Sequence, residues 1–304
     1  MSVAPDGTLY AMQRGATISR FDPGARGDAS PAAVFCFTHK KTEHVFGFAA
    51  SNGEVDVLAY GSLSAFARTS SGLVDPLRYI GDAQYGAEGK PGIKDGWGSD
   101  APFQITVGSE GTDYILKDTS CRCHAGGSQT DILMFSPKAN GTVSPDRDIV
   151  PLDPAAKDNT YAEAIALDSR SRLFFLDASG DLVVSRPGAI KPYAREAHLP
   201  LAKQAGPDNV LAVTNAGTAY VGDGSVVLVV TGATGAAPAV KRIGGARTRV
   251  TRVDGLATDA SGKLYVENCA HGVASILVFK PGSIGNIEPS YALGGPHTNL
   301  GCSE

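Results

Sequence analysis

The stretch Phe279-Lys280-Pro281-Gly282-Ser283-Ile284-Gly285-Asn286-Ile287-Glu288-Pro289 decides the fold, because its frame, Phe-x-Pro-x-x-x-Gly-x-x-x-Pro, returns along the chain. The same frame begins at Phe21 and Phe135, and a worn copy begins at Phe66. Weaker copies lie around Pro187–Pro192 and Gly235–Pro238. Self-similarity of this kind indicates stacked supersecondary units, none of which can bury its apolar faces alone. The sequence therefore predicts a repeat architecture over its whole length.

A second mark in each repeat predicts the strands. A turn glycine is followed three residues later by an aromatic residue, at Gly7/Tyr10, Gly111/Tyr114, Gly217/Tyr220 and Gly262/Tyr265. Repeat four has Ser171 and Phe174 in these places, and repeat two departs with Gly53 and Asp56. Glycine accepts the positive φ of a tight hairpin turn without steric cost, so apolar strands are expected on both sides of it. Ile276–Phe279 and Tyr291–Leu293 then supply a third and a fourth strand, which makes each repeat one propeller blade.

The spacing of the repeats gives the number of blades. The turn positions 7, 53, 111, 171, 217 and 262 are separated by 46, 58, 60, 46 and 45 residues, and ordinary four-stranded blades take about 40–50 residues. We therefore predict an all-β fold: a single six-bladed β-propeller domain over residues 1–304, with four antiparallel strands per blade. The blades are expected at residues 1–37, 45–81, 102–150, 162–194, 208–244 and 254–295.

The repeat resembles that of the NHL-repeat and gluconolactonase-like (senescence marker protein) six-bladed propellers. The segment from Asp254 to Val266, DGLATDASGKLYV, is similar to their repeated phrase, and the likeness covers almost the whole chain. It is specific for the fold and weak for the activity, since propellers include both binding proteins and enzymes.

Composition limits the function further. The net charge is −4, which argues against a general nucleic-acid role, because that role needs a basic groove for phosphates. No apolar run approaches the roughly 20 residues of a membrane helix. We expect a monomeric propeller in an extracytoplasmic compartment, secreted or periplasmic, whose export leader precedes this sequence in a longer bacterial reading frame. The five cysteines are compatible with that compartment, and a disulfide between Cys36 and Cys302 would close the ring between the first and last blades.

The longest insertions predict which face is functional. They are Asp82–Ala101, Asp118–Gln129 and Pro151–Tyr161. The first and third link blades and the second joins middle strands, so alternation of strand direction brings all three to one face. Loops gathered on one face of a repeat protein usually form its binding surface. A ligand or partner protein is expected there, around the mouth of the central channel.

The repeat alignment also predicts residues at that mouth. Eight positions before the turn residue stand Val45, Phe103, Glu163, Asn209 and Asp254 in blades two to six. Glu163, Asn209 and Asp254 would direct oxygen atoms toward the axis from successive blades, as a divalent cation such as Ca²⁺ or Zn²⁺ requires. The alternative is that they line a wet channel. The resemblance implies a metal held by a Glu, an Asn and an Asp; Asp254 and Asn209 match in place, whereas the family's Glu lies in the first blade, where this chain has no residue.

Other residues are candidates on the same face. Phe103, Asn268 and His271 are expected to contact a ligand. His124 belongs to the cluster Cys121-Arg122-Cys123-His124, which could bind zinc or copper, form a disulfide or pack within its loop. Trp97 could stack on a flat ligand or pack on the rim. Asp177 and Asp223 could act as general bases or cap turns.

Two functions follow from these residues. The first is an NHL-like propeller that binds a small molecule or a partner protein on the loop-rich face. The second is a metal-dependent hydrolase of lactones or esters, in which a cation at Glu163, Asn209 and Asp254 polarises a carbonyl group. We prefer the first, because the first-blade glutamate of the family is missing.

Overall fold

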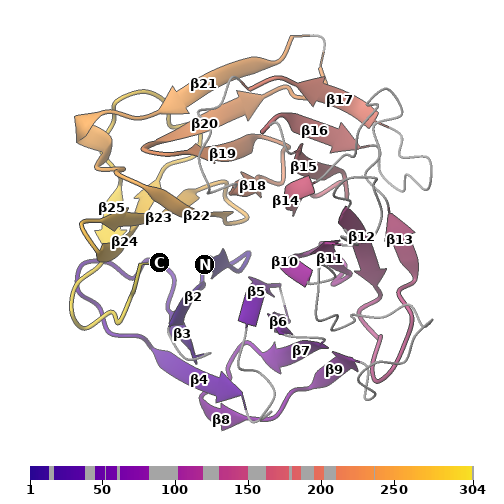
Figure 1. Ribbon diagram of the computed structural model, residues 1–304. Helices are drawn as coiled ribbons and strands as arrows, with labels where there is room; N and C mark the ends of the chain where they lie inside the picture. Colours follow the sequence, from indigo (N-terminus) through magenta and orange to yellow (C-terminus); the bar gives the residue numbers. More distant parts are fainter. Residues whose placement is uncertain are drawn as a thin grey trace.

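The computed structural model describes residues 1–13, 17–37, 45–51, 53–59, 62–81, 102–118, 130–149, 162–177, 180–185, 195–201, 210–235 and 237–302. These residues form six sheets arranged as a ring around a central axis (Figure 1). The prediction of an all-β, six-bladed propeller is confirmed. In the described part of the chain the only helical segment is a single 3-10 turn, Ala246–Thr248, and no helix there is long and apolar enough to cross a membrane.

Each blade runs from an innermost to an outermost strand in sequence order. Blades one to three consist of β1 (Ser2–Val3), β2 (Leu9–Gln13), β3 (Thr17–Phe21) and β4 (Ala33–Phe37); β5 (Val45–Ala50), β6 (Glu54–Ala59), β7 (Ser62–Ala67) and β9 (Arg78–Gly81); and β10 (Pro102–Val107), β11 (Asp113–Asp118), β12 (Thr130–Phe135) and β13 (Arg147–Ile149). Blades four to six consist of β14 (Ala162–Leu167), β15 (Leu173–Asp177), β16 (Leu182–Ser185) and β17 (Arg195–Leu199); β18 (Leu211–Val213), β19 (Ala219–Asp223), β20 (Val226–Thr231) and β21 (Ala239–Ile243); and β22 (Val253–Thr258), β23 (Leu264–Ala270), β24 (Val273–Phe279) and β25 (Tyr291–Leu293).

The turn between the first two strands follows the predicted chemistry. Gly7, Gly111, Gly217 and Gly262 have φ between +80° and +87°, and Ser171 in blade four takes the same conformation at φ +57°. The aromatic residue three positions later is buried in each case: Tyr10, Tyr114, Phe174, Tyr220 and Tyr265. These side chains face the joints between blades, where the hydrophobic core lies.

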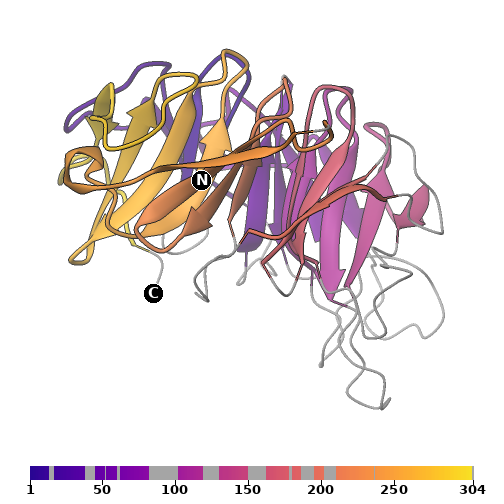
Figure 2. The same cartoon turned by 90° about the horizontal axis from the view of Figure 1, so that it is seen from above.

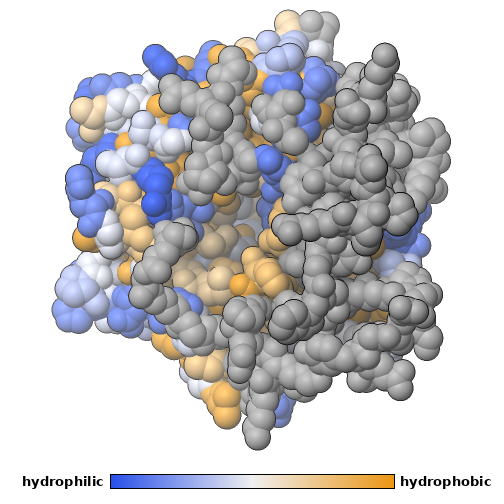
Figure 3. Space-filling view, in the orientation of Figure 1, coloured by the Kyte–Doolittle hydropathy of each residue, from blue (hydrophilic) through white to orange (hydrophobic). Residues whose placement is uncertain are grey.

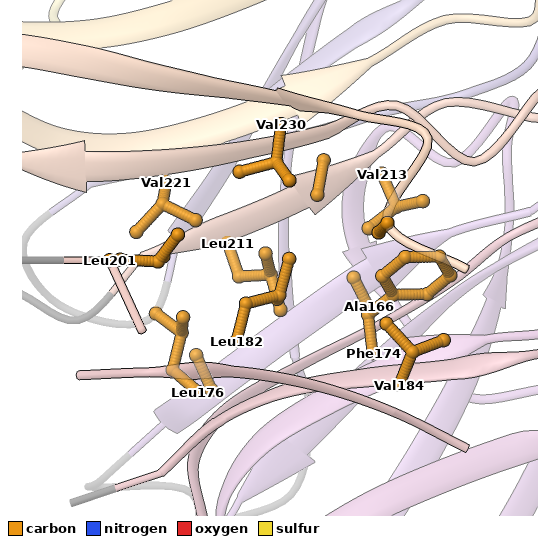
Figure 4. Close-up of a cluster of buried hydrophobic side chains, with 13 residues drawn as sticks. Ala166, Phe174, Leu176, Leu182, Val184, Leu201, Leu211, Val213, Val221 and Val230 are labelled. Atoms are coloured by element: carbon orange, nitrogen blue, oxygen red, sulfur yellow. The ribbon is translucent and has the colours of Figure 1, made fainter. Parts of the chain in front are cut away.

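The core consists of six apolar clusters, one between each pair of neighbouring blades. Figure 4 shows the cluster between blades four and five, in which Phe174, Leu176 and Leu182 face Leu211, Val213 and Val221. The cluster between blades one and six joins Leu9 and Phe21 to Tyr265 and Leu293. The ring is therefore closed by the same kind of packing that joins its other blades.

The repeated frame places a phenylalanine and a glycine at the same joint. Phe21, Phe66, Phe135 and Phe279 are at most 1% exposed. The glycine six residues later pairs in parallel with the outer strand of the preceding blade, in the pairs Gly27–Leu293, Gly72–Phe35, Gly141–Ile80 and Gly285–Ile243. Its φ lies between +64° and +81°, a conformation that glycine adopts without the clash of a Cβ atom. In blade two this contact extends into the short strand β8 (Gly72–Val74), which adds a fifth, parallel strand to the sheet of blade one.

Blade two departs from the repeat at Asp56, which stands where the other blades carry the aromatic residue. Asp56 is 1% exposed and accepts a hydrogen bond from Arg78 at 2.8 Å, while Arg78 also donates to Asp113 of blade three at 2.7 Å. Glu54 lies 3.4 Å from the same guanidinium group. Among the described residues, Asp113 Oδ1 is buried without a hydrogen-bond partner. One arginine thus serves two buried carboxylates between blades two and three.

This excess of buried negative charge makes protonation favourable. Burial raises the pKa of Asp113 to about 6, although the Arg78 guanidinium opposes the shift. Burial and the neighbouring Asp113 carboxylate raise the pKa of Asp56 well above its usual range. The folded state therefore holds a proton more tightly than the unfolded chain, and ionisation of the group destabilises the fold.

We expect the free energy of unfolding to contain a contribution that falls as the pH rises from the unfolded value of 3.8 to about 6. Asp113→Asn should reduce the fall in the free energy of unfolding over this pH range by about 1–3 kcal/mol. Urea unfolding at several pH values measures this change. Asp148→Asn, on the exposed outer strand of blade three, is the control and should leave the profile unchanged. Parallel profiles for the wild type and Asp113→Asn would contradict the assignment.

Candidate functional site

The inner strands of the six blades enclose a cavity of about 490 Å³ along the central axis. Each blade contributes apolar side chains to its wall, among them Val3, Phe48, Ile105, Ile165, Leu211 and Leu256. In the space-filling view of Figure 3, a hollow at the centre of the ring brings apolar and hydrophilic residues together. The predicted central channel is therefore present.

A β-bulge recurs near the start of four inner strands. The pairing register shifts around Phe46, Phe103, Glu163 and Asp254, and all four residues line the cavity. A bulge leaves one residue unpaired and redirects its side chain. Because every inner strand begins on the face where the blades are linked, the four side chains surround the same mouth. We define these four residues as the bulge ring.

Three residues of the bulge ring lie at the positions that the repeat alignment predicts, and the fourth lies one residue later. Phe103, Glu163 and Asp254 lie where the alignment places them. Val45 does not: it pairs with Ala59, and the next residue, Phe46, is the bulged one. Gly53 lacks the positive φ of the turn residues in the other blades. The position eight residues before Gly53 therefore falls one residue short of the bulge. A glycine follows the bulged residue in both blade two (Gly47) and blade six (Gly255). Aligning these two glycines would have located the bulged residue of blade two, because a glycine inside a strand often marks a bulge.

The bulge ring has two chemically different halves. Blades two and three contribute the phenyl rings of Phe46 and Phe103, whereas blades four and six contribute the carboxylates of Glu163 and Asp254. Asn209 of blade five lies outside the described residues, and its neighbour Val210 lines the cavity. The mouth of the channel is thus apolar on one side and acidic on the other.

Asp254 is held by an arginine that immediately precedes its own strand, β22. Arg252 Nε donates to Asp254 Oδ1 at 2.5 Å and Arg252 Nη2 donates to Oδ2 at 2.7 Å. The Asp254 side chain is only 2% exposed, whereas that of Arg252 is 44% exposed. A bidentate pair of this kind fixes the carboxylate and places a positive charge beside both of its oxygen atoms.

Asn268 positions this pair. Its Oδ1 accepts hydrogen bonds from the Thr251 backbone N–H at 2.7 Å and from the Thr251 hydroxyl at 3.0 Å, and its Nδ2 donates to Ser275 at 3.3 Å. Asn268 is 3% exposed and does not line the cavity. We therefore assign it to the support of the segment before Asp254 rather than to ligand contact.

The remaining candidates lie away from the cavity wall. His271 is exposed at the tip of the β23–β24 turn, at φ +51°. Asp223 ends β19 and Asp177 ends β15, and neither lines the cavity. Trp97 and His124 lie outside the described residues. Asp177 instead belongs to a cluster with Asp181 and His198 on the rim of blade four, a group that the sequence reasoning missed because His198 is distant in the chain.

The cysteines pair differently from the expectation. Cys269, the penultimate residue of β23, forms a disulfide with Cys302, and Cys36 is a free thiol. The proposed pair Cys36–Cys302 is therefore wrong, because the segment after β25 crosses back toward the channel instead of following the outer edge. Both sulfur atoms lie within 4.8 Å of an Asp254 carboxylate oxygen. As a disulfide they offer no thiolate, so this group is not a metal site.

We expect the disulfide to stabilise the fold substantially, because it closes a loop with a sequence separation of 33 residues. Cys302→Ser should lower the free energy of unfolding by about 3–4 kcal/mol, measured by urea unfolding under non-reducing conditions. Cys36→Ser removes a free thiol and should leave stability nearly unchanged. Thiol labelling with peptide mass analysis should modify Cys36 and spare Cys302; labelling of Cys302 in the folded protein would contradict the pairing.

Comparison with known proteins supports the fold. No protein-family model and no curated protein matches the sequence. Among solved structures, a catalytically inactive histidine-to-alanine variant of virginiamycin B lyase from Staphylococcus aureus, bound to quinupristin, is similar with a TM-score of 0.53 and 13% identity, over 92% of this chain and 82% of that chain.

Two gluconolactonase structures are also similar. One, from Xanthomonas campestris, has a TM-score of 0.44 and 12% identity over 74% of this chain and 69% of that chain. The other, a structural-genomics target named for the gluconolactonases, has a TM-score of 0.46 and 13% identity over 86% and 84%. At 13% identity the likeness to the lyase, which has a TM-score of 0.53, supports the fold and leaves the activity open.

Proposed function

We propose that this propeller binds a small organic molecule at the mouth of its central channel. The observation that carries the proposal is the bulge ring, which surrounds one end of a cavity of about 490 Å³ with two phenyl rings and two carboxylates. Small-molecule sites typically measure about 300–1,000 Å³ and combine apolar walls with a few placed polar groups. A concave site of this size favours a small ligand over a partner protein.

The two halves of the bulge ring define the ligand. An apolar or aromatic group would pack against Phe46 and Phe103, which contribute the hydrophobic part of the binding energy. A hydrogen-bond donor, such as an amine or a hydroxyl group, would reach Glu163 on the opposite side. Asp254 is already paired with Arg252, so the positive charge beside it weakens its attraction for a cationic ligand.

We expect ligand-observed NMR to detect binding of small amphipathic molecules, tested with the matched pair phenethylamine and 2-phenylethanol. Glu163→Gln should weaken the amine at least about tenfold, equivalent to about 1.4 kcal/mol, and affect the alcohol less. Phe103→Ala should weaken both. Glu288→Gln, whose side chain is 70% exposed on the outer edge of blade six, is the control. Binding that none of the cavity variants changes would exclude this site.

A metal-dependent hydrolase is the second candidate, because Glu163 and Asp254 occupy equivalent bulges and could hold a cation with Asn209. The described residues do not fit this centre as they are arranged. The Arg252 guanidinium contacts both oxygen atoms of Asp254 and would repel a second cation, and the two proposed bases, Asp177 and Asp223, are not at the cavity wall. We derive no reaction step through such a metal.

Metal analysis distinguishes the two candidates. We expect that Asp254→Asn leaves the content of divalent ions after dialysis unchanged, measured by inductively coupled plasma mass spectrometry. Arg252→Gln removes the competing charge and serves as the matched variant. An equimolar ion that is present in the wild type and absent from Asp254→Asn would establish the hydrolase centre and overturn our preference.

The proposed compartment is extracytoplasmic. It is supported by the Cys269–Cys302 disulfide, because disulfides persist in oxidising compartments and are rare in the cytosol of most organisms. Alkylation of free thiols at the moment of cell lysis, followed by peptide mass analysis, tests whether the disulfide exists in the cell.

A further inference from the structure

We propose that Asp177, Asp181 and His198 form a binding site for a divalent transition-metal ion, most suitably Zn²⁺, on the rim of blade four. The Nε2 atom of His198 lies 3.5 Å from Asp177 Oδ2 and 3.3 Å from Asp181 Oδ2. The three ligand atoms all lie within 4.8 Å of one another. This site is separate from the channel, since none of the three residues lines the cavity.

The distances suit a tetrahedral ion. Zinc binds histidine nitrogen and carboxylate oxygen at about 2.0–2.2 Å, so neighbouring ligand atoms of a tetrahedral centre lie about 3.3–3.5 Å apart. The histidine contacts to both carboxylates have this length. A proton on the imidazole can be donated from Nε2 to one carboxylate at a time, whereas a divalent ion contacts all three groups together.

The fold positions each ligand independently of an ion. Asp177 ends β15, and its Oδ1 accepts a hydrogen bond from the Asp181 backbone N–H at 3.0 Å. Asp181 Oδ1 accepts a hydrogen bond from the Leu201 backbone N–H at 3.1 Å. These bonds hold one oxygen of each carboxylate and turn the other toward His198. His198 lies on β17, the outermost strand, where it pairs with Val183 of β16. The ligands thus come from a turn and from the neighbouring strand of one sheet.

The ligand types select among ions. Calcium prefers six to eight oxygen ligands, and a set of one imidazole and two carboxylates instead suits zinc and related transition metals. The side chains are 32% exposed at His198, 17% at Asp177 and 21% at Asp181. Solvent therefore reaches the site and can supply a water molecule as the fourth ligand. An ion bound here would connect the β15–β16 turn to β17 and stabilise the outer edge of blade four.

The test is a Zn²⁺ titration of the full chain against a competing chromophoric chelator. We expect His198→Gln to lose one zinc ion per chain, or to bind it at least about tenfold more weakly, and Asp181→Asn to act in the same direction. Asp223→Asn is the matched control, because Asp223 occupies the corresponding strand end of blade five. Zinc bound elsewhere, including at Cys121–His124, is the same in all variants and cancels in the comparison.

A second readout separates metal binding from a structural role of the ion pair. Zinc should raise the thermal unfolding temperature of the wild type and of Asp223→Asn, since it binds the folded state, and should not raise that of His198→Gln. Unfolding without zinc reports any destabilisation caused by the substitution itself. Equal zinc stoichiometry and affinity in the wild type and His198→Gln would overturn the proposal, as would the absence of zinc binding from the wild type. Repeating the channel-ligand measurement in the presence of EDTA shows that the two sites are independent.

Discussion

The contact between a frame glycine and the outer strand of the preceding blade sets the geometry of the whole molecule. Gly27, Gly141 and Gly285 each donate a backbone hydrogen bond of 2.6–2.7 Å to that strand, to Ala292, Tyr79 and Arg242 respectively. The phenylalanine six residues earlier is buried at the same joint. A backbone bond and an apolar anchor together fix the angle between two blades at four described joints: those of blade one with blades six and two, of blade two with blade three, and of blade five with blade six.

This contact also explains how the ring closes without a blade shared between the two ends of the sequence. Gly27 in blade one pairs with Leu293 in blade six just as Gly285 pairs with Ile243. The segment that follows β25 reinforces the same joint: His297 contacts Asp28 through its backbone and its ring, and Cys302 is bonded to Cys269. Figure 2 shows the described strands of the blades forming a disc when the ring is seen from the side.

Chemically distinctive groups lie where the blades depart from their common pattern. The bulge ring carries aromatic residues in blades two and three and acids in blades four and six. Blade two replaces a buried aromatic residue with Asp56, which requires Arg78 and shares it with Asp113. Blade four gathers two aspartates and a histidine at its rim. The repeat thus provides a stable framework, and single substitutions within it create polar sites at defined positions.

The sequence by itself determined the number of blades, the strand order and the buried aromatic residues. These features depend on local chemistry: Gly262 must accept a positive φ, Phe279 must be buried, and both recur at fixed spacing. It also located Phe103, Glu163 and Asp254 at the channel, because an alignment of equal repeats preserves position around the ring.

Only the tertiary structure decided the contacts that depend on distance between segments. It showed that Phe46 rather than Val45 faces the channel, because a bulge displaces the register by one residue. In the structure Cys302 is bonded to Cys269, Asp254 is paired with Arg252, and His198 lies beside Asp177. None of these contacts has a repeated sequence signature. Cys302 and His198 meet partners that are distant in the chain, whereas the Arg252–Asp254 pair depends on how two nearby side chains are turned toward each other at a bulge.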